Sequence, residues 1–385
     1  MPSAPLALSL FYLTSFGLFG VYLPYFNPYL EGLGFSALQI GLISALVPLS
    51  NIFVPALSGR LSDRIGRRRP LILASSILAT LSFSIILGAR SFMAVTLVIG
   101  TFAILRAPAV PLVDATAMEV SERGGPHYGR MRVWGSVAFI VVSLLTGWSV
   151  GLSGASVVVP IALCLLLLNV LACLTLPGDP QRRPPAARAA GIGVQARTPA
   201  VILFLAACVL SQAAHGPYYV FFSIHLQRAG YRPSAIGLLW ALAVACEIAA
   251  MLRMRHLLDR FGTSGVMIAA LLLAAARWGI CASSVAMPAM IVAQALHAAS
   301  FAMFHVAAVT HVHRLFGEEH GAGGQALYAS ATYGLGNVLG MVLSGALVDR
   351  VGIHPVFAGA AGLALVGASL MAAAGRRRLW TIGRL

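Results

Sequence analysis

Charged side chains are scarce in this chain, and lysine is absent. Only 10% of the 385 residues are charged, whereas 59% are hydrophobic. Soluble globular domains carry about 25% charged residues, so this composition excludes a soluble protein. All 26 basic residues are arginine, because the sequence contains no lysine. We therefore expect a chain that folds in lipid.

Nucleotide-binding loops and catalytic constellations are missing as well. No glycine-rich phosphate loop occurs, and no nucleophile stands at a recognisable spacing from a base, which disfavours an ATP-driven pump and an enzyme. The five cysteines fall in apolar stretches without metal-ligand spacing, so we expect no disulfide, metal or cofactor. The N-terminus has no basic n-region or small-residue cleavage site, so the first span should be retained.

Long apolar runs are what the sequence has instead. About 20 apolar residues cross a hydrocarbon core of roughly 30 Å. Such runs predict spans near residues 4–30, 36–58, 70–89, 92–115, 130–150, 156–176, 199–227, 234–256, 264–286, 288–313, 325–347 and 353–374. These runs are too long and uniform for barrel strands. We expect an all-α membrane protein with twelve transmembrane helices.

The arginines predict the orientation of these spans. With both ends inside, the inner loops and tail would hold 20 of the 26 arginines and the outer loops four, Arg90, Arg228, Arg232 and Arg350. Positively charged loops stay in the cytoplasm, so both termini are expected there. The net charge of +15 then reflects topology and contact with anionic headgroups. We expect a bilayer and a small-molecule substrate as partners, no nucleic acid, and a monomer.

The chain repeats itself at an offset of 196 residues. Gly20 pairs with Gly216, Tyr22 with Tyr218, Phe26 with Phe222, Gly34 with Gly230, and Asp63-Arg64-Ile65-Gly66 with Asp259-Arg260-Phe261-Gly262. Transporters are often built from two such tandem halves with a substrate site between them. We predict a six-helix bundle over residues 1–176, a cytoplasmic linker over 177–198, and a second six-helix bundle with a short basic tail over 199–385.

A loop motif identifies a superfamily. The segment Gly59-x-Leu61-x-Asp63-Arg64-x-Gly66-Arg67-Arg68, between spans two and three, resembles the signature loop of the major facilitator superfamily, with a degenerate copy at Asp259-Arg260. The resemblance implies two pseudo-symmetric six-helix bundles and a gating role for these residues. Gly59 would allow close helix contact, and Asp63 would face a helix N-terminus and pair with arginine. The alternative is an arginine-rich loop that only fixes topology.

Several stretches are similar to the proton-linked 3-phenylpropionate permease group of that superfamily. They are residues 128–136, 277–279, 294–301 and 325–328. The loop between spans two and three follows the general superfamily pattern more closely. The resemblance implies uptake of a small organic solute with protons, and an aromatic carboxylate as one candidate substrate.

Glu247 is the most informative polar residue in the predicted spans. A charge at mid-bilayer costs about 3 kcal/mol or more unless it is paired or hydrated, so it is a functional candidate. Glu247 lies in span eight, and the repeat pairs it with Asn51. We expect Glu247 to bind and release a proton, with Arg277 in span nine as its nearest counter-charge. The alternative is a static ion pair that joins the two spans.

Other polar residues complete the candidate site. His297 and His305 lie eight residues apart near one face of span ten, and either would relay a proton or bond a substrate, although a lone buried histidine is more often a packing residue. Substrate binding is predicted for Tyr22, Asn27, Asn51, Arg106, Tyr218 and Arg277. Asp114 is expected to pair with Arg130 or Arg132 as a gate, or only to pack helices.

These observations favour a proton-coupled importer that works by alternating access. A proton-driven exporter of amphipathic compounds is the second hypothesis, because the residues do not encode direction. A non-transporting membrane receptor is the third. Such a receptor would need no titratable groups inside the membrane.

Overall fold

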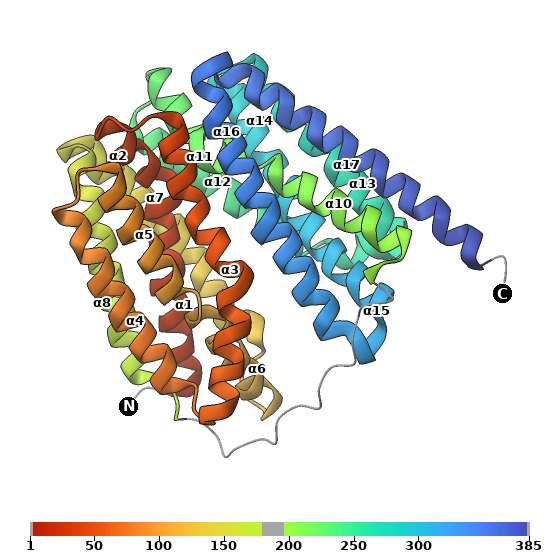
Figure 1. Cartoon of the computed structure of the whole chain (residues 1–385), viewed down its shortest axis with the longest axis horizontal. Coiled ribbons are helices and arrows are strands. Elements are labelled where there is room, and N and C mark those ends of the chain that lie inside the picture. Colours follow the sequence, from red (N-terminus) through yellow and green to blue (C-terminus); the bar gives the residue numbers. More distant parts are fainter. Residues whose placement is uncertain (1–2, 179–195, 383–385) are drawn as a thin grey trace. The chain divides into compact units, whose positions relative to one another are not determined.

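The computed structural model describes residues 3–178 and 196–382 (Figure 1). Within those ranges, twelve helical segments are long and apolar enough to cross a membrane. Their bounds agree with the predicted spans to within a few residues at most ends. The clearest exceptions are the ninth segment, which begins ten residues before its predicted start, at Met254, and the second and fourth, which continue seven residues past their predicted ends, to Ile65 and Glu122. The prediction of an all-α fold with twelve spans is confirmed.

The first six spans are built from the following elements. They are α1 (Ala4–Val21), the π-helical η1 (Tyr22–Phe26) and α2 (Asn27–Gly32); α3 (Ala37–Ile65); α4 (Arg69–Ser84) and η2 (Ile85–Leu87); α5 (Phe92–Arg106) and α6 (Ala109–Glu122); α7 (Tyr128–Ser153); and η3 (Ala155–Val157) with α8 (Val158–Thr175).

The last six spans follow the same plan. They are α10 (Pro199–Ala213) and α11 (Gly216–Arg228); α12 (Pro233–Met251); α13 (Met254–Ser283); α14 (Met287–His297) with the π-helical η4 (Ala298–Met303) and the start of α15 (Phe304–Ala329); the end of α15 with the π-helical η5 (Ser330–Gly336) and α16 (Asn337–Val351); and α17 (Ile353–Ile382).

Proline explains several breaks in these spans. Pro24 lies in the π-helical segment of the first span, and Pro108 lies where α5 gives way to α6. Proline removes a backbone donor and clashes with the preceding turn, so the helix kinks or changes its hydrogen-bond pattern there. Pro48 and Pro55, by contrast, lie inside the continuous α3.

The sequence repeat is visible in the backbone. Gly34 and Gly230 follow the first helix of each half with φ of +86° and +85°, and Gly66 and Gly262 have φ of +69° and +66°. Only glycine adopts these angles without strain, because it has no Cβ. The duplicated glycines therefore mark the same turns in both halves.

Contacts divide the chain into two compact units. Unit 1 comprises Met1–Pro185 and Phe222–Ala241, and unit 2 comprises Ala186–Phe221 and Leu242–Leu385. The boundary runs through α11 and α12, so part of the second half groups with the first. The division into bundles over 1–176 and 199–385 stays a prediction. Most of the predicted linker, residues 179–195, and the end of the basic tail lie outside the described residues.

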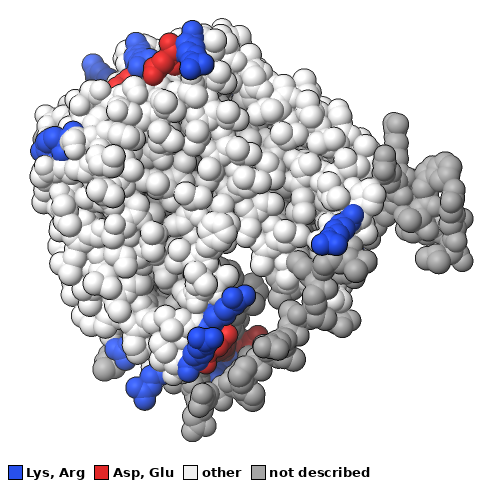
Figure 2. Space-filling model, in the orientation of Figure 1, with Lys and Arg blue, Asp and Glu red and all other residues white. Residues whose placement is uncertain are grey.

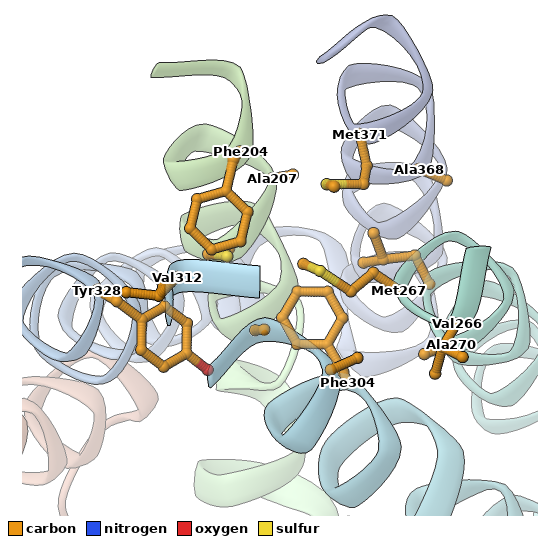
Figure 3. Close-up of a cluster of buried hydrophobic side chains, with 14 of the residues drawn as sticks. Phe204, Ala207, Val266, Met267, Ala270, Phe304, Val312, Tyr328, Ala368 and Met371 are labelled. Carbon is orange, nitrogen blue, oxygen red and sulfur yellow. The ribbon is translucent and has the colours of Figure 1, made fainter. Parts of the chain in front are cut away.

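Each unit has an apolar core of its own. In unit 1, Leu8, Phe11 and Tyr12 of α1 pack on Leu112 and Val113 of α6, all buried. In unit 2, side chains from α10, α13, α15 and α17 converge on Met267 and Phe304 (Figure 3). The surface matches a lipid environment, because charged side chains gather in small groups at the edges of the face in Figure 2, with a broad uncharged zone between them.

Candidate functional site

Arg277 lies at the centre of a buried polar cluster in unit 2. Its side chain is fully buried on α13. One terminal nitrogen donates to Ser300 Oγ at 3.2 Å, and the other donates to Gln294 Oε1 at 3.2 Å. The guanidinium also lies over the rings of Tyr218 and Trp278, at 4.2 and 4.1 Å from their centroids. Cation–π contacts of this kind stabilise a charge in a desolvated site.

Glu247 meets His297 beside this cluster. His297 Nε2 lies 2.8 Å from Glu247 Oε1, and the two side chains are 6% and 13% exposed. At this distance, either the imidazole donates a proton to the carboxylate or the protonated carboxyl donates to the imidazole. The contact therefore holds a shared proton.

Arg277 interacts electrostatically with Glu247, as expected of its counter-charge, but the two side chains form no direct ion pair. In the part of the chain that is described, Arg277 makes no ion pair, and the carboxylate contacts His297 instead. The reason is side-chain direction. Successive residues of a helix point about 100° apart. Two charged residues at a similar depth on neighbouring helices therefore do not always point toward each other.

A second titratable cluster follows along the same span. His305 Nδ1 lies 2.7 Å from the Tyr333 hydroxyl and 3.3 Å from the Tyr328 hydroxyl. Phe301 separates this cluster from His297, with its ring nearly parallel to both imidazoles. His297 and His305 therefore lie along one face of the span, as predicted, but in different hydrogen-bonded groups.

Several buried polar atoms near Arg277 lack a partner. Within the described residues, Arg277 Nε, His215 Nε2, Trp278 Nε1 and His297 Nδ1 make no hydrogen bond. An unsatisfied buried polar group costs about 1–3 kcal/mol, so a native site rarely leaves four together without a use. Arg277 Nε and Trp278 Nε1 are donors, which suits a ligand with acceptor oxygens. His215 donates through Nδ1 to the carbonyl of Ser211, so its neutral ring offers Nε2 as an acceptor.

The first half carries a different polar cluster in unit 1. Asp114 Oδ1 accepts hydrogen bonds from the hydroxyls of Tyr12 at 2.6 Å and Tyr128 at 3.1 Å. The guanidinium of Arg132 lies 3.5 Å from the centroid of the Phe16 ring. The expected ion pair of Asp114 with Arg130 or Arg132 is therefore wrong here, because tyrosine hydroxyls satisfy the carboxylate. Arg130 is exposed.

The remaining predicted substrate residues lie apart from one another. Arg106 donates to the carbonyl of Ser15 at 3.0 Å, and the ring of Tyr22 stacks on Phe26 with centroids 4.7 Å apart. Asn27 Oδ1 accepts from Ser44 at 3.0 Å, and Asn51 is exposed on α3. Their roles in substrate binding stay predictions.

The superfamily-like loop does not make its expected contacts. No atom lies within 4 Å of where a Gly59 Cβ would stand, so the close helix contact expected there is absent. Asp63 and Asp259 are exposed and form no ion pair within the described part of the chain, and Arg64, Arg67 and Arg260 are also exposed. Gly66 instead ends α3 in the left-handed conformation.

The loop's own ion pair uses Arg68. Arg68 Nη1 lies 2.7 Å from Glu119 Oε1 of α6. The sequence does not indicate this pair, because Glu119 lies beyond the predicted end of span four near residue 115.

A tyrosine hydroxyl lies where helices of the two halves cross within unit 1. Tyr25 donates to the carbonyls of Ser143 on α7 and Pro233 on α12, at 2.9 and 3.2 Å. A Cβ on Gly147 or Gly237 would clash with that hydroxyl and with backbone. Glycine at positions 147 and 237 is therefore required where these helices cross.

Sequence reasoning missed several residues of the unit 2 site. Gln294 lies three positions before His297, and that spacing on one helix face was the available signal. Tyr328 at the end of α15 and Tyr333 in the π-helical η5 both meet His305, and the sequence does not reveal that π turn. Among the described residues, no group of three His, Cys, Asp or Glu could hold a metal ion.

Comparisons with known proteins agree with this architecture. A family model described as the MFS_1 like family matches residues 6–358. The probable 3-phenylpropionic acid transporter of Escherichia coli (strain K12) is 31% identical over 358 residues, covering 91% of this chain and 92% of that protein. The maltose permease of Geobacillus stearothermophilus is 29% identical over 360 residues, covering 90% and 89%.

A solved structure shares the fold. A point mutant of the nucleoside transporter NupG superposes with a TM-score of 0.86, at 20% identity, covering 97% of this chain and 100% of that one. At that identity the likeness concerns the fold alone.

Proposed function

Because this chain belongs to the MFS_1 like family of membrane transporters, we propose that it is a secondary active transporter that takes up a small organic solute with protons by alternating access. The chain is a multi-pass membrane protein of the major facilitator type, and its relatives are transporters, not enzymes. The coupling ion, the substrate and the direction of transport are what we propose.

The contact between Glu247 and His297 carries the proposal of proton coupling. Two mostly buried side chains share a proton at 2.8 Å, beside an arginine that forms no direct ion pair in the described chain. Protonation of the carboxylate removes one negative charge from this desolvated group and so changes its electrostatic balance. Binding of a proton and binding of an anionic solute would therefore influence each other.

The surroundings of Arg277 support an aromatic carboxylate as the substrate. Arg277 Nε and Trp278 Nε1 are buried donors without partners among the described residues, and Tyr218 and Trp278 offer aromatic rings next to the charge. A carboxylate accepts such hydrogen bonds, and a ring packs against aromatic side chains. The relative named for 3-phenylpropionic acid supports the same class.

Uptake into proteoliposomes tests this function. With an acidic exterior, labelled 3-phenylpropionate should enter faster than into protein-free vesicles, which report passive entry of the protonated acid. A one-unit pH gradient supports up to about tenfold accumulation for one proton per anion. Entry that ignores the gradient would contradict proton coupling. A lumen that becomes alkaline as substrate enters would indicate exchange against protons, the exporter alternative.

Topology and assembly belong to the same proposal. We place both termini in the cytoplasm, because the arginines concentrate in the loops on that side. We also propose a monomer. Labelling of single cysteines placed at either end of the chain in intact cells, and the mass of the purified protein in detergent, would test these two statements.

A further inference from the structure

His297 and His305 lie on one span of unit 2, and each belongs to a separate group of titratable side chains. Glu247 and His297 form the first group, and His305, Tyr328 and Tyr333 form the second. No direct hydrogen bond connects a member of one group to a member of the other in the described chain. Eight residues separate the two histidines, which corresponds to about 12 Å along a helix. A proton does not cross that distance without an intermediate donor and acceptor.

The ring of Phe301 occupies the interval. Its centroid lies 5.4 Å from that of His297 with the planes at 13°, and 6.5 Å from that of His305 with the planes at 16°. His215 and Tyr333 meet the same ring edge-on, at 6.3 and 6.4 Å. Phenylalanine has neither donor nor acceptor. The one side chain stacked between the two imidazoles is therefore unable to pass a proton.

The backbone at Phe301 is also unusual. Phe301 lies in the π-helical segment Ala298–Met303, which follows His297 directly. Single π turns inside α-helices are rare and occur often at functional sites. The extra residue in the turn sets which side chain faces the interval between the histidines.

We infer that Phe301 is a proton insulator: its ring separates the Glu247–His297 proton site from the His305–Tyr328–Tyr333 group, so that protons cross only when transport moves the site. This inference rests on the proposed proton coupling. It assigns to an apolar residue the task of preventing uncoupled proton flow, which would dissipate the gradient that drives uptake.

Other titratable groups surround the interval. His215 and Tyr218 contact the ring of His297, Tyr219 contacts Tyr218, and Arg277 lies over the ring of Tyr218. None of these side chains stacks between the two imidazoles. Tyr219 packs against His215 and Tyr218 and interacts electrostatically with Glu247 and Tyr333, so its hydroxyl is the rival route between the two groups. Tyr219→Phe should leave the low proton entry unchanged, because the insulator is the Phe301 ring.

The experiment measures proton entry into proteoliposomes without substrate, with a lumenal pH dye and the membrane potential clamped. Phe301→His places a third imidazole between the first two and should raise proton entry at least about fivefold over wild type, because histidine exchanges protons near neutrality. Phe301→Leu keeps an apolar side chain and should keep the low rate. Adding Glu247→Gln or His305→Ala to Phe301→His should restore the low rate.

The results distinguish a failure of the insulator inference from a failure of the proposed proton coupling. Wild-type proton entry on substrate addition tests coupling, whereas substrate-free entry in the Phe301 variants tests insulation. Proton entry in Phe301→His equal to wild type, or a leak that survives both second substitutions, would overturn the inference. Phe301→His is usable only if it elutes as a single peak and unfolds cooperatively on heating. Otherwise Phe301→Ala takes its place, because it opens the interval to water and should also leak protons.

Discussion

The two halves of the chain treat a buried carboxylate differently. In unit 1, two tyrosine hydroxyls donate to Asp114, and Arg132 stacks on a phenylalanine ring. In unit 2, Glu247 contacts His297, and Arg277 stacks on two aromatic rings. In the part of the chain that the structure describes, Asp114 and Arg132 form no ion pair, and neither do Glu247 and Arg277. Tyrosine and histidine ordinarily release protons near pH 10 and 6.5, so only the second arrangement suits proton exchange near neutral pH.

The comparison teaches that duplication has kept the architecture and divided the chemistry. We assign a structural role to the Asp114 cluster and a proton-coupling role to the Glu247 cluster. Paired substitutions, one in each half, can break or sharpen that assignment.

The largest expected effect concerns the two arginines. Arg277→Ala should weaken binding of 3-phenylpropionate by about 100-fold, because about 3 kcal/mol is lost when one side of a buried charged contact is removed. Arg132→Ala should change binding less than about threefold, because Arg132 touches rings of its own unit. Ligand-induced thermal shifts on purified protein measure both. Equal losses in the two variants would contradict the assignment.

A smaller effect is expected from the partners of the carboxylates. His297→Gln keeps a hydrogen bond to Glu247 but cannot exchange protons near neutrality, so gradient-driven uptake should fall about tenfold. Tyr12→Phe removes one hydrogen bond to Asp114 and should lower the free energy of unfolding by about 1 kcal/mol without changing the response to the gradient. Uptake rates with and without the gradient distinguish these results. A gradient response lost in Tyr12→Phe would place coupling in the first half.

The smallest effect concerns two glycines next to the arginines. A Cβ on Gly135 would lie 2.8 Å from Arg132 Nη1 and 2.9 Å from the Phe16 ring, whereas a Cβ on Gly279 would meet nothing within 4 Å. Gly135→Ala should therefore destabilise the protein by about 1 kcal/mol, and Gly279→Ala should not. Thermal unfolding in detergent compares them. A loss of stability in Gly279→Ala alone would contradict the packing described for both units.

The sequence predicted the spans better than the contacts of the polar residues inside them, whose roles in the site stay predictions. Twelve apolar runs and a 196-residue repeat determine which helices form, because lipid tolerates few alternatives. Glu247, His297 and Arg277 were recognisable, since polar groups in such runs are rare. Their partners were not recognisable, because pairing depends on helix rotation and on the π turns at Ala298–Met303 and Ser330–Gly336. Helix rotation also decides that tyrosines, and not an arginine, bond to Asp114, so the sequence did not reveal that contact.

The most direct measurement compares Glu247→Gln with Asp114→Asn in proteoliposomes. The account predicts that Glu247→Gln still exchanges labelled for unlabelled 3-phenylpropionate across the membrane but, when the exterior is acidic, accumulates it no faster than protein-free vesicles do. Asp114→Asn should both exchange the substrate and accumulate it. Accumulation by Glu247→Gln at the wild-type level, or its loss in Asp114→Asn alone, would contradict the claim that the second-half carboxylate carries the proton.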